Sequence, residues 1–500
     1  MCGIVGYVGN KNATDFLIEG LSKLEYRGYD SAGIAVINNG EVEIVKHKGR
    51  LANLSRELEN NPAEGTIGIG HTRWATHGEP SDINSHPHQA SKGDITVVHN
   101  GIIENYAELT KFLKDKGYEF KSATDTEVIP NLIHYYYNGD LFEAVAKTIE
   151  RLEGSYALGV ICGNEPDKIV AVRKDSPLIV GLGDNEKFIA SDIPAVLNYT
   201  RDIYLLEDKE IVVITKNSAE VFNLNGEKIS KEIYKVTWNE DAAEKGGYDS
   251  FMLKEIHEQP KAIRDTMTGR VLLNDKVKFE DFNLTLEELN EIDRIYIIAC
   301  GTAYNAGLMG KVAIEKLAKI PVEVEIASEF RYREPLVTNK TLIITLSQSG
   351  ETADTLAVLR DAKKVGAKTL AVTNVVGSSI SREADNVIYT MAGPEIAVAS
   401  TKAYTTQVVV MNLLGMYFAD LKGILDKDVE RELKESLLSL PEKIEAVLEM
   451  KSQVAEVSKI LAEETDLFYL GRGADYALVI EGALKVKEIS YVHSEAYAGG

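Results

Sequence analysis

LIITLSQSGETADTLAVLRDA occupies residues 342–362, and this stretch decides the fold of the second half of the chain. An apolar run ends in a loop of serine, glutamine and glycine, and a helical pattern follows at once, as in a βαβ unit. The loop carries Ser347, Gln348, Ser349 and Thr352. Hydroxyls, an amide and backbone N–H groups at a helix N-terminus suit a phosphate group. A serine or threonine that only caps the helix is the alternative.

The same pattern continues on both sides of this stretch. RIYIIACGTAYNAG, which carries Thr302, opens a strand and a helix that we expect to run to about residue 318. Apolar strands follow at 369–375 and 386–393, and AVASTKAYTTQ adds Ser400. Strands that alternate with helices predict a parallel sheet. No Walker A sequence and no GxGxxG with a downstream acidic partner is present, which argues against ATP and NAD.

An internal repeat links this region to the end of the chain. IYIIACGTAY at 295–304 resembles LFYLGRGADY at 467–476, so that Gly301 matches Gly473. A long helical stretch, roughly 403–463, is expected between the two copies. The second copy has 34 residues from its first strand to Gly500. We therefore expect the sequence to stop inside a domain.

The first 235 residues have a different pattern. Short strands are broken by glycine and polar turns, and helical patterns fall at 14–25, 104–117 and 140–152. This predicts antiparallel sheets with helices on their outer faces. Polar, glycine-containing WNEDAAEKGGYDSF then indicates a linker, before a helical pattern that we expect Pro260 to interrupt.

Cys2 follows the initiator methionine. Removal of Met1 leaves Cys2 with a thiol and a free α-amine. The amine has a reference pKa of ~7.7–8, so it can act as a base near neutral pH. A thiolate attacks amide carbonyls readily, and one residue thus supplies both nucleophile and base. The alternative is that Met-Cys-Gly is merely the start of the chain.

Three further motifs give Cys2 a context: HTRWATHGEP (71–80), HNGIIENY (99–106) and TDTEV (124–128). Arg73 can clamp a carboxylate, with Trp74 shielding the cavity. Asn100 and the Gly101 N–H can form an oxyanion hole, and Asp125 can hold an α-ammonium group. A site that binds both a carboxylate and an ammonium group indicates a free amino acid as the ligand. Taken singly, Asn-Gly is more often a turn and Asp125 more often a helix N-cap.

Composition excludes several classes of protein. The net charge is −22, with 44% apolar and 26% charged residues, so nucleic acid and membrane surfaces are poor partners. Three widely spaced cysteines, Cys2, Cys162 and Cys300, predict neither a disulfide framework nor a zinc site. The sequence shows no long apolar run and no secretory signal. The cytoplasm is therefore the expected location.

In order along the chain, MCGIVGYVG, LEYRGYDSAG, HTRWATHGEP, HPH, HNGIIENY and TDTEV resemble the class II glutamine amidotransferases, which are N-terminal-nucleophile hydrolases. The resemblance implies a layered αββα sandwich with Cys2 as nucleophile and Asn100 and Gly101 as oxyanion hole. It implies glutamine contacts from Arg73, Thr76, His77 and Asp125. It gives no role to His71, His86 and His99, for which buried structural histidines are the alternative.

The second half resembles the sugar isomerase (SIS) fold. Both halves together resemble the glutamine–fructose-6-phosphate aminotransferases, through KGGYDSFMLKEIHEQP, EIASEFRYR and EGALKVKEISYVHSEAYAGG. This resemblance implies that the phosphate of fructose 6-phosphate sits on Ser347, Gln348, Ser349 and Thr352, with Thr302 nearby. Ser400 is a further candidate contact to this substrate. The resemblance also implies Glu488 as the acid–base group, and Lys485 beside it is a further candidate catalytic residue. Glu481, Lys485 and Glu488 share one helical face, and a solvated salt bridge is the alternative.

The sequence therefore predicts an enzyme that takes ammonia from glutamine and uses it to convert fructose 6-phosphate to glucosamine 6-phosphate. Trp74 is the expected ammonia gate, no metal or cofactor is required, and a homodimer is expected. Alternatives are a non-catalytic sugar-phosphate sensor and a stand-alone glutaminase. An asparagine synthetase would need an SGGLDS-type ATP loop, and an amidophosphoribosyltransferase an acidic diphosphate-binding loop; neither occurs here.

The expected domains are a glutaminase domain (1–238), a linker with a connecting helix (239–285), a first SIS domain (286–430), and inter-domain helices with the start of a second SIS domain (431–500). Many members of the family have serine where this chain has Ala303, so one phosphate contact is expected to be missing. The family's ring-opening histidine and Schiff-base lysine match no residue up to Gly500. A protein that really ended at Gly500 would be expected to have lost sugar isomerisation.

Overall fold

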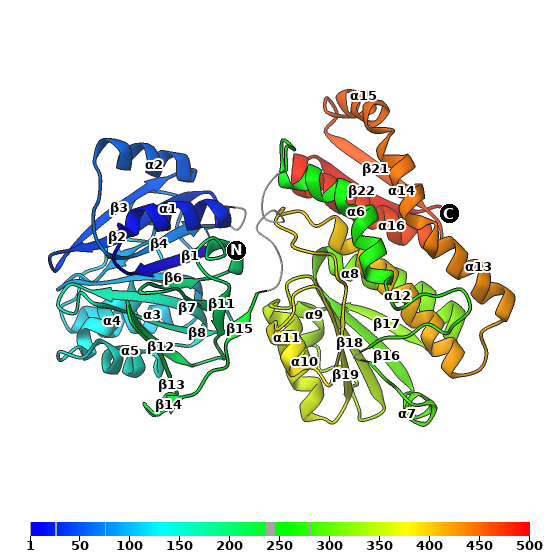
Figure 1. Ribbon diagram of the computed structural model, residues 1–500, viewed down its shortest axis with the longest axis horizontal. Helices are drawn as coiled ribbons and strands as arrows, with labels where there is room; N and C mark the ends of the chain where they lie inside the picture. The colour runs from blue at the N-terminus through cyan, green and yellow to red at the C-terminus, as the bar shows by residue number, and fades with distance from the viewer. Residues whose placement is uncertain (1, 26–27, 76, 237–245, 281) are drawn as a thin grey trace. The chain divides into compact units, whose positions relative to one another are not determined.

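The computed structural model describes residues 2–25, 28–75, 77–236, 246–280 and 282–500 (Figure 1). The chain divides into two compact units, residues 1–243 and 244–500. The division falls within the polar stretch that the sequence marks as a linker. Each unit is described by itself.

Unit 1 contains two antiparallel sheets. The eight-stranded sheet has the order β15-β11-β9-β10-β1-β4-β2-β3 and the seven-stranded sheet the order β14-β13-β12-β8-β7-β6-β5. The strands of the first sheet are β1 (Gly3–Val8), β2 (Ser31–Asn38), β3 (Glu41–Lys48), β4 (Ile67–Arg73), β9 (Ile179–Leu182), β10 (Lys187–Ala190), β11 (Asp202–Leu205) and β15 (Tyr234–Lys235). Those of the second are β5 (His88–Gln89), β6 (Ile95–Ile103), β7 (Gly154–Cys162), β8 (Lys168–Lys174), β12 (Ile211–Thr215), β13 (Ala219–Phe222) and β14 (Lys228–Ile229).

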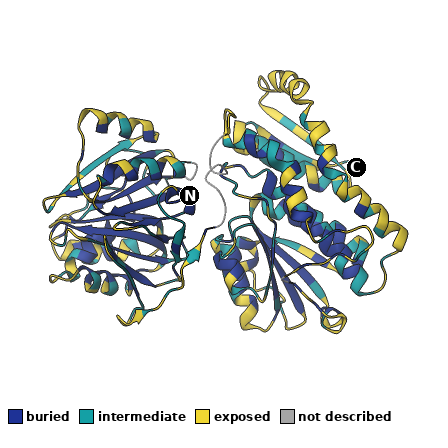
Figure 2. Cartoon of the chain, viewed as in Figure 1, coloured by how far each residue is buried: buried dark blue, intermediate teal, exposed yellow. Residues whose placement is uncertain are grey.

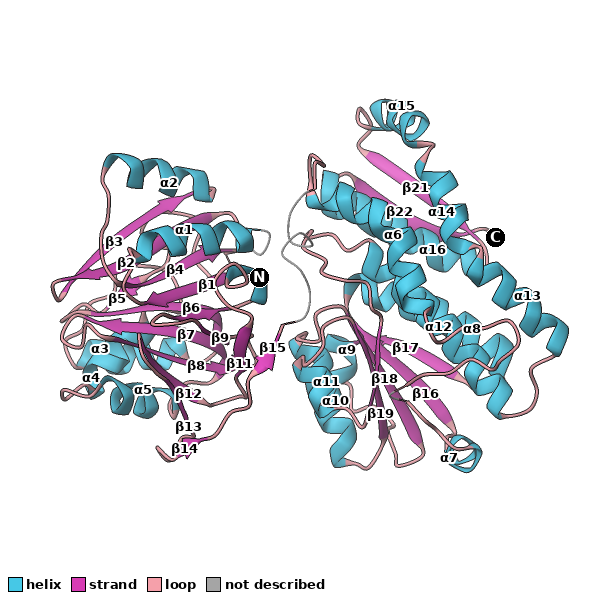
Figure 3. Cartoon of the chain, in the orientation of Figure 1, coloured by secondary structure: helices cyan, strands magenta, loops and turns pink. Residues whose placement is uncertain are grey.

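Helices cover the outer faces of both sheets, which gives four layers (Figure 3). Strand β1 shows how its sequence builds them: Ile4 and Val8 belong to the core between the sheets, whereas Val5 and Tyr7 pack with α1. This alternation is the two-residue period of a strand. The predicted αββα sandwich is confirmed. The helices are α1 (Ala13–Leu24), α2 (Leu51–Asn60), α3 (Tyr106–Asp115), α4 (Val128–Tyr136) and α5 (Leu141–Ile149), with a short 3-10 turn at Ile193–Ala195.

Unit 2 is built on a five-stranded parallel sheet of order β17-β16-β18-β19-β20. In β16, Ile295 and Ile297 join the large core under α8 and α12, while Tyr296 and Ile298 pack on the opposite face. The strands are β16 (Arg294–Ala299), β17 (Val322–Ile326), β18 (Thr341–Ser347), β19 (Lys368–Thr373) and β20 (Asn386–Tyr389). The predicted parallel α/β architecture is confirmed.

The helices of unit 2 flank this sheet and continue beyond it. They are α6 (Phe251–Met267), α7 (Leu286–Glu291), α8 (Gly301–Ala318), α9 (Ala327–Tyr332), α10 (Ala353–Lys364), α11 (Ser379–Glu383), α12 (Lys402–Leu421), α13 (Lys427–Leu438), α14 (Leu440–Leu448), α15 (Lys451–Leu461) and α16 (Ala474–Ser490). The helical stretch expected at roughly 403–463 is confirmed, and it consists of four helices, α12 to α15, separated by short breaks.

The expectation that Pro260 interrupts the helix is wrong, because α6 runs through this residue. Proline removes one backbone donor and so leaves the carbonyl of Ile256 without its usual partner. The side-chain amide of Gln259 donates to this carbonyl at 3.0 Å. A neighbouring side chain thus replaces the lost hydrogen bond, and the helix continues.

The two repeat copies form the same local structure. Each begins with a strand, β16 or β21 (Asp466–Gly471), and continues into a helix, α8 or α16. Gly301 and Gly473 both have positive φ, 55° and 60°, at the start of these helices, a conformation that favours glycine. β21 pairs in parallel with β22 (His493–Ala498), and Figure 2 shows much of α15 and β21 exposed.

Candidate active sites

A pocket in unit 1 surrounds Cys2. It draws on the start of β1, the end of β4, the middle of β6 and the loop before α4. Its lining residues are Cys2, Arg73, Trp74, His77, His86, His99, Gly101, Thr124, Asp125 and Thr126. The pocket brings together the candidates Cys2, Arg73, Trp74, His77, Gly101 and Asp125, whereas Thr76 lies outside the described residues.

The Cys2 thiol is half-buried beside Trp74. The backbone N–H of Trp74 donates to Sγ at 3.2 Å. Burial raises the pKa of the Cys2 thiol above its ordinary value, and the Trp74 N–H opposes the rise only in part. The resting group is therefore a thiol near neutral pH, and a base must remove its proton before it attacks.

Arg73 is a buried cation at the end of β4. Its Nη2 donates to the carbonyls of His77 and of Gly78, the latter at 2.9 Å. Its Nη1 is buried and has no hydrogen-bond partner in the described part of the chain. Native proteins satisfy buried polar groups, so an orphan guanidinium nitrogen in a pocket wall indicates an anionic ligand such as a carboxylate.

Asp125 lies on the same pocket, in the loop before α4. Its Oδ2 accepts the Ile103 N–H at 2.8 Å. The N-cap of α4 is Glu127, so the alternative that Asp125 is a helix cap is wrong. A buried carboxylate and a buried guanidinium in one small pocket match the two charged ends of a free amino acid.

Asn100 and Gly101 lie inside β6, so the alternative that Asn-Gly forms a turn is wrong. Asn100 Nδ2 donates to the backbone carbonyl of Cys2 at 3.0 Å. Gly101 has φ +128°, and a Cβ there would lie 2.1 Å from the Ser155 carbonyl oxygen. Only glycine fits, and the strand pairing thereby brings the Asn100 amide next to the nucleophile.

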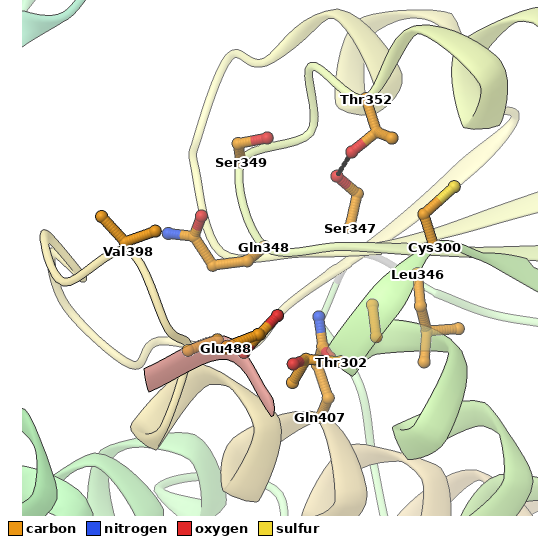
Figure 4. A pocket seen from close by; sticks show the side chains of 12 residues that line it. Cys300, Thr302, Leu346, Ser347, Gln348, Ser349, Thr352, Val398, Gln407 and Glu488 are labelled. Carbon is orange, nitrogen blue, oxygen red and sulfur yellow. Dashed lines mark hydrogen bonds between the residues drawn. The ribbon is translucent and has the colours of Figure 1, made fainter. Parts of the chain in front are cut away.

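The second pocket lies at the carboxyl ends of the parallel strands of unit 2, where open α/β sheets commonly bind ligands. Figure 4 shows it, lined by Cys300, Thr302, Ala303, Leu346, Ser347, Gln348, Ser349, Thr352, Val398, Ser400, Gln407 and Glu488. It brings together all six residues expected to bind the sugar phosphate, and Glu488.

The loop after β18 is organised by its own hydroxyls. Ser347 Oγ lies 2.9 Å from Thr352 Oγ1 and accepts the Gly350 N–H at 3.0 Å, the first contact being the dashed line in Figure 4. Thr352 is the N-cap of α10, yet its side chain makes no capping hydrogen bond. The alternative that this side chain caps the helix is therefore wrong.

Lys485 connects the pocket to a buried network on α16. Its Nζ donates to Thr302 Oγ1 at 2.7 Å and also contacts Glu488. Glu481 lies behind, 3.3 Å from Lys485, and accepts from Thr302 at 3.0 Å and from Asn305 at 2.7 Å. Glu481 is buried, and burial raises the pKa of its carboxyl group. The solvated salt bridge is thus wrong for Glu481, and only Glu488 is exposed.

A second buried carboxylate holds the segment that carries Val398 and Ser400. Glu255, on α6, accepts the N–H groups of Ile396 and Ala397 at 2.5 and 3.0 Å. Burial raises the pKa of Glu255 to about 7, although both N–H groups oppose the rise. Lys402, at the start of α12, pairs with Glu258 at 2.6 Å. Helix α6 therefore positions one wall of the pocket.

Sequence reasoning missed several lining residues. In unit 1 these are His86, His99, Thr124 and Thr126. In unit 2 they include Val398 and Gln407, which lie within AVASTKAYTTQ, so a wider reading of that motif finds them. No helix in the described ranges is long and apolar enough to span a membrane. Those ranges also bring no three histidine, cysteine or acidic side chains into a metal-binding group.

Known proteins match both halves of the chain. A family model described as "Glutamine amidotransferase domain" matches residues 71–198, and one described as "SIS domain" matches residues 288–417. A Clostridium perfringens protein named glutamine–fructose-6-phosphate aminotransferase [isomerizing] is 64% identical over the whole chain, and a Caldanaerobacter subterraneus protein of that name is 57% identical. The chain covers 82% of each relative. The C-terminal domain of a Francisella tularensis glucosamine-fructose-6-phosphate aminotransferase is 41% identical, with a TM-score of 0.49, over 51% of this chain and 72% of that one.

Proposed function

The chain belongs to the glutamine–fructose-6-phosphate aminotransferase (isomerizing) family, and we propose how its own residues carry out the two halves of that reaction. Unit 1 releases ammonia from glutamine. Unit 2 takes fructose 6-phosphate and returns glucosamine 6-phosphate. The observation that carries the proposal is that each unit has a pocket whose chemical groups fit one substrate.

Glutamine binds by its charged ends. The orphan Nη1 of Arg73 takes the α-carboxylate, and the buried Asp125 takes the α-ammonium group. His77 and Thr76 complete the proposed contacts. Binding in this pocket removes both charged ends of glutamine from water. The side-chain amide of glutamine then reaches the Cys2 thiol.

Cys2 then acts as the nucleophile. After removal of Met1, its α-amine accepts the thiol proton, which the raised pKa of this thiol makes necessary. Sγ attacks the side-chain carbonyl carbon, and the oxyanion is stabilised by the Asn100 amide and the Gly101 N–H. The amine returns the proton to the leaving nitrogen and ammonia departs. Water cleaves the remaining thioester to glutamate. Trp74, on the pocket wall, is the proposed gate for the ammonia.

Fructose 6-phosphate binds with its phosphate on the loop after β18 and on Thr302. Ammonia attacks C2 of the open-chain sugar, and water leaves as the imine forms. Glu488 removes a proton from C1 and delivers a proton to C2, while the C1 hydroxyl gives up its proton and the imine nitrogen gains one, which leaves an aldehyde at C1 and an amine at C2. Lys485, held between Thr302 and Glu488, positions this carboxylate.

Two variants separate the two half-reactions. Cys2→Ala should abolish glutamate release, with Cys162→Ala as a thiol control that keeps it. Glu488→Gln should abolish glucosamine 6-phosphate formation while glutamate release continues, with the exposed Glu456→Gln on α15 as its control. Glutamate and amino-sugar assays on the same samples measure both products.

The results of these assays distinguish the proposed enzyme from the alternative functions. Glutamate release by Cys2→Ala contradicts the nucleophile. Unchanged amino-sugar formation by Glu488→Gln contradicts the acid–base group. A chain that binds fructose 6-phosphate, hydrolyses glutamine and yields no amino sugar is a glutaminase joined to a sugar-phosphate sensor. The domain ranges given above, a homodimer and a cytoplasmic location remain proposals that rest on the family.

A further inference from the structure

His71 is fully buried in β4, directly behind the proposed oxyanion hole. Its Nε2 lies 3.0 Å from the backbone carbonyl oxygen of His99 and 3.0 Å from Oδ1 of Asn100. The proposed glutaminase reaction assigns this histidine no role, and neither does the family resemblance.

The surroundings of His71 fix its tautomer. The carbonyl of His99 can only accept a hydrogen bond, so the ring nitrogen that faces it carries the hydrogen. The other nitrogen, Nδ1, is buried without a hydrogen-bond partner among the described residues. Burial lowers the pKa of His71 to about 3, so the ring is neutral at neutral pH, with its single proton on Nε2.

This N–H in turn fixes the orientation of the Asn100 amide. Oδ1 accepts from His71, so Nδ2 faces the carbonyl of Cys2. A flipped amide would turn its NH₂ group against the His71 N–H and its oxygen against the Cys2 carbonyl. Both contacts would become repulsive, and the donor would point away from the nucleophile.

The ring itself is held by other histidines. His71 stacks on His86 with centroids 4.1 Å apart. Nδ1 of His86 accepts the His99 N–H at 3.3 Å, and Nδ1 of His99 lies 2.8 Å from Thr126 Oγ1. His71 therefore has little freedom to rotate away from Asn100.

We propose that His71 is a positioning residue for glutamine hydrolysis: its Nε2–H locks the Asn100 amide with the NH₂ group toward Cys2, where it stabilises the oxyanion. The inference rests on the proposed glutaminase function. A residue that acts in this way changes stabilisation of the transition state and leaves the binding of the charged ends of glutamine to Arg73 and Asp125 unchanged.

The test measures kcat and KM for glutamate release by the full chain. His71→Phe removes the donor and keeps a flat ring. It should lower kcat by about 10–100-fold with KM little changed, since outright loss of one oxyanion donor costs about 10²–10³-fold. His71→Gln, whose amide nitrogen can take the place of Nε2, should restore most of kcat. His88→Phe, a change of equal size in the same buried cluster without contact to Asn100, is the matched control.

A double-mutant comparison shows whether His71 acts through Asn100. In the Asn100→Ala background, His71→Phe should have no further effect on kcat, because there is no amide left to orient. Multiplicative losses, or an unchanged kcat for His71→Phe in the native background, would overturn the inference. If His71→Phe does not fold, the pair His71→Gln and His71→Asn decides, because asparagine is too short to reach Asn100. Equal kcat for these two variants overturns it.

Failure of the proposed function gives a different result. In that case the unmodified chain releases no glutamate, or Cys2→Ala releases it as well. A chain whose glutaminase activity depends on Cys2 and Asn100 but ignores His71 contradicts the inference alone.

Discussion

The pocket of unit 1 is anchored on paired strands through Arg73, His99 and Gly101, whereas the pocket of unit 2 is anchored on loops next to the parallel strands, through Gln348, Ser349 and Ser400. We call them the strand-built and the loop-built pocket. Arg73 belongs to β4, which pairs with β1 and β2, and Gly101 belongs to β6, which pairs with β7 along its whole length. Ser347, Thr302 and Ser400 stand where parallel strands give way to helices. A sandwich places catalytic groups in a rigid, desolvated setting, while strand ends supply free N–H groups and hydroxyls suited to a phosphate.

The two units also bury opposite kinds of titratable group. Unit 1 buries His71, His86, His88 and His99, and burial lowers the pKa of each. Unit 2 buries Glu255 and Glu481, and burial raises the pKa of each. In both units burial keeps the neutral form. The buried histidines of unit 1 and the buried glutamates of unit 2 therefore contribute to the pH dependence of stability with opposite signs.

The largest expected effect tests the rigidity of the strand-built pocket. Gly101→Ala puts a Cβ 2.1 Å from the Ser155 carbonyl oxygen, at φ +128°. We expect a loss of about 4 kcal/mol in unfolding free energy and no measurable glutamate release, since β6 and β7 must separate.

Gly139→Ala is the control, because φ there is +102° and a Cβ meets nothing within 4 Å. It should cost about 1 kcal/mol and keep activity. Denaturant unfolding and glutamate release measure both variants. Equal losses for the two would show that backbone strain, and not strand pairing, sets the requirement for glycine.

The second prediction concerns acid. The four buried histidines have lowered pKa values, so below about pH 6.5 the unfolded chain binds protons that folded unit 1 does not. Unit 1 should therefore lose up to about 1.4 kcal/mol per histidine for each pH unit below that value. Hydrogen exchange followed by mass spectrometry, with peptides assigned to each unit, measures this between pH 7 and 5.

His88→Phe removes one of these histidines. The change in unfolding free energy per pH unit should be smaller in this variant, by the contribution of about one bound proton. A unit 1 that is as stable at pH 5 as at pH 7 contradicts the contrast between the two units.

These histidines show where sequence reasoning reached its limit. The strand, loop and helix around Ser347 were predictable because the pattern is local, and so was the parallel sheet. His71 lies in β4 of the eight-stranded sheet and His99 in β6 of the seven-stranded sheet, so the packing of the two sheets brings them and His86 together. Asn100–Gly101 was open to interpretation as a turn because the strand that pairs with it, β7, begins about 50 residues further along the chain. Pro260 misled for a different reason: the compensating hydrogen bond comes from the adjacent Gln259, but its side-chain orientation is visible only in the structure.

The buried Glu255 of unit 2 should contribute to stability with the opposite dependence on pH. The pKa of Glu255 is raised to about 7, above the unfolded value. Its contribution is therefore fully present below about pH 4.5 and is lost as pH rises through 7, by about 3 kcal/mol in total. Glu255→Gln mimics the protonated form, so the stability of the variant relative to the unmodified chain should grow between pH 5 and 8.

The same hydrogen-exchange experiment measures this difference in stability on peptides of α6 and of residues 391–401. Glu351→Gln is the control. The carboxylate of Glu351 also accepts a backbone N–H, that of Ser379 at 2.8 Å, but Glu351 is only half-buried. A difference between Glu255→Gln and the unmodified chain that shrinks as pH rises contradicts the assigned sign.

The smallest expected effect concerns the loop-built pocket. Ala303 lines it next to Thr302, and Ala303→Ser adds one hydroxyl at the start of α8. One additional hydrogen bond to a charged phosphate contributes about 1 kcal/mol, so the KM for fructose 6-phosphate should fall about fivefold. Glutamate release without the sugar should not change, because unit 1 is untouched. Ala303→Gly, which adds no donor, is the control. An unchanged KM in Ala303→Ser would mean that the phosphate lies on Ser347, Ser349 and Thr352 alone. The open pocket of unit 2 would then tolerate the loss of one hydrogen-bond donor, whereas the strand-built pocket of unit 1 would not.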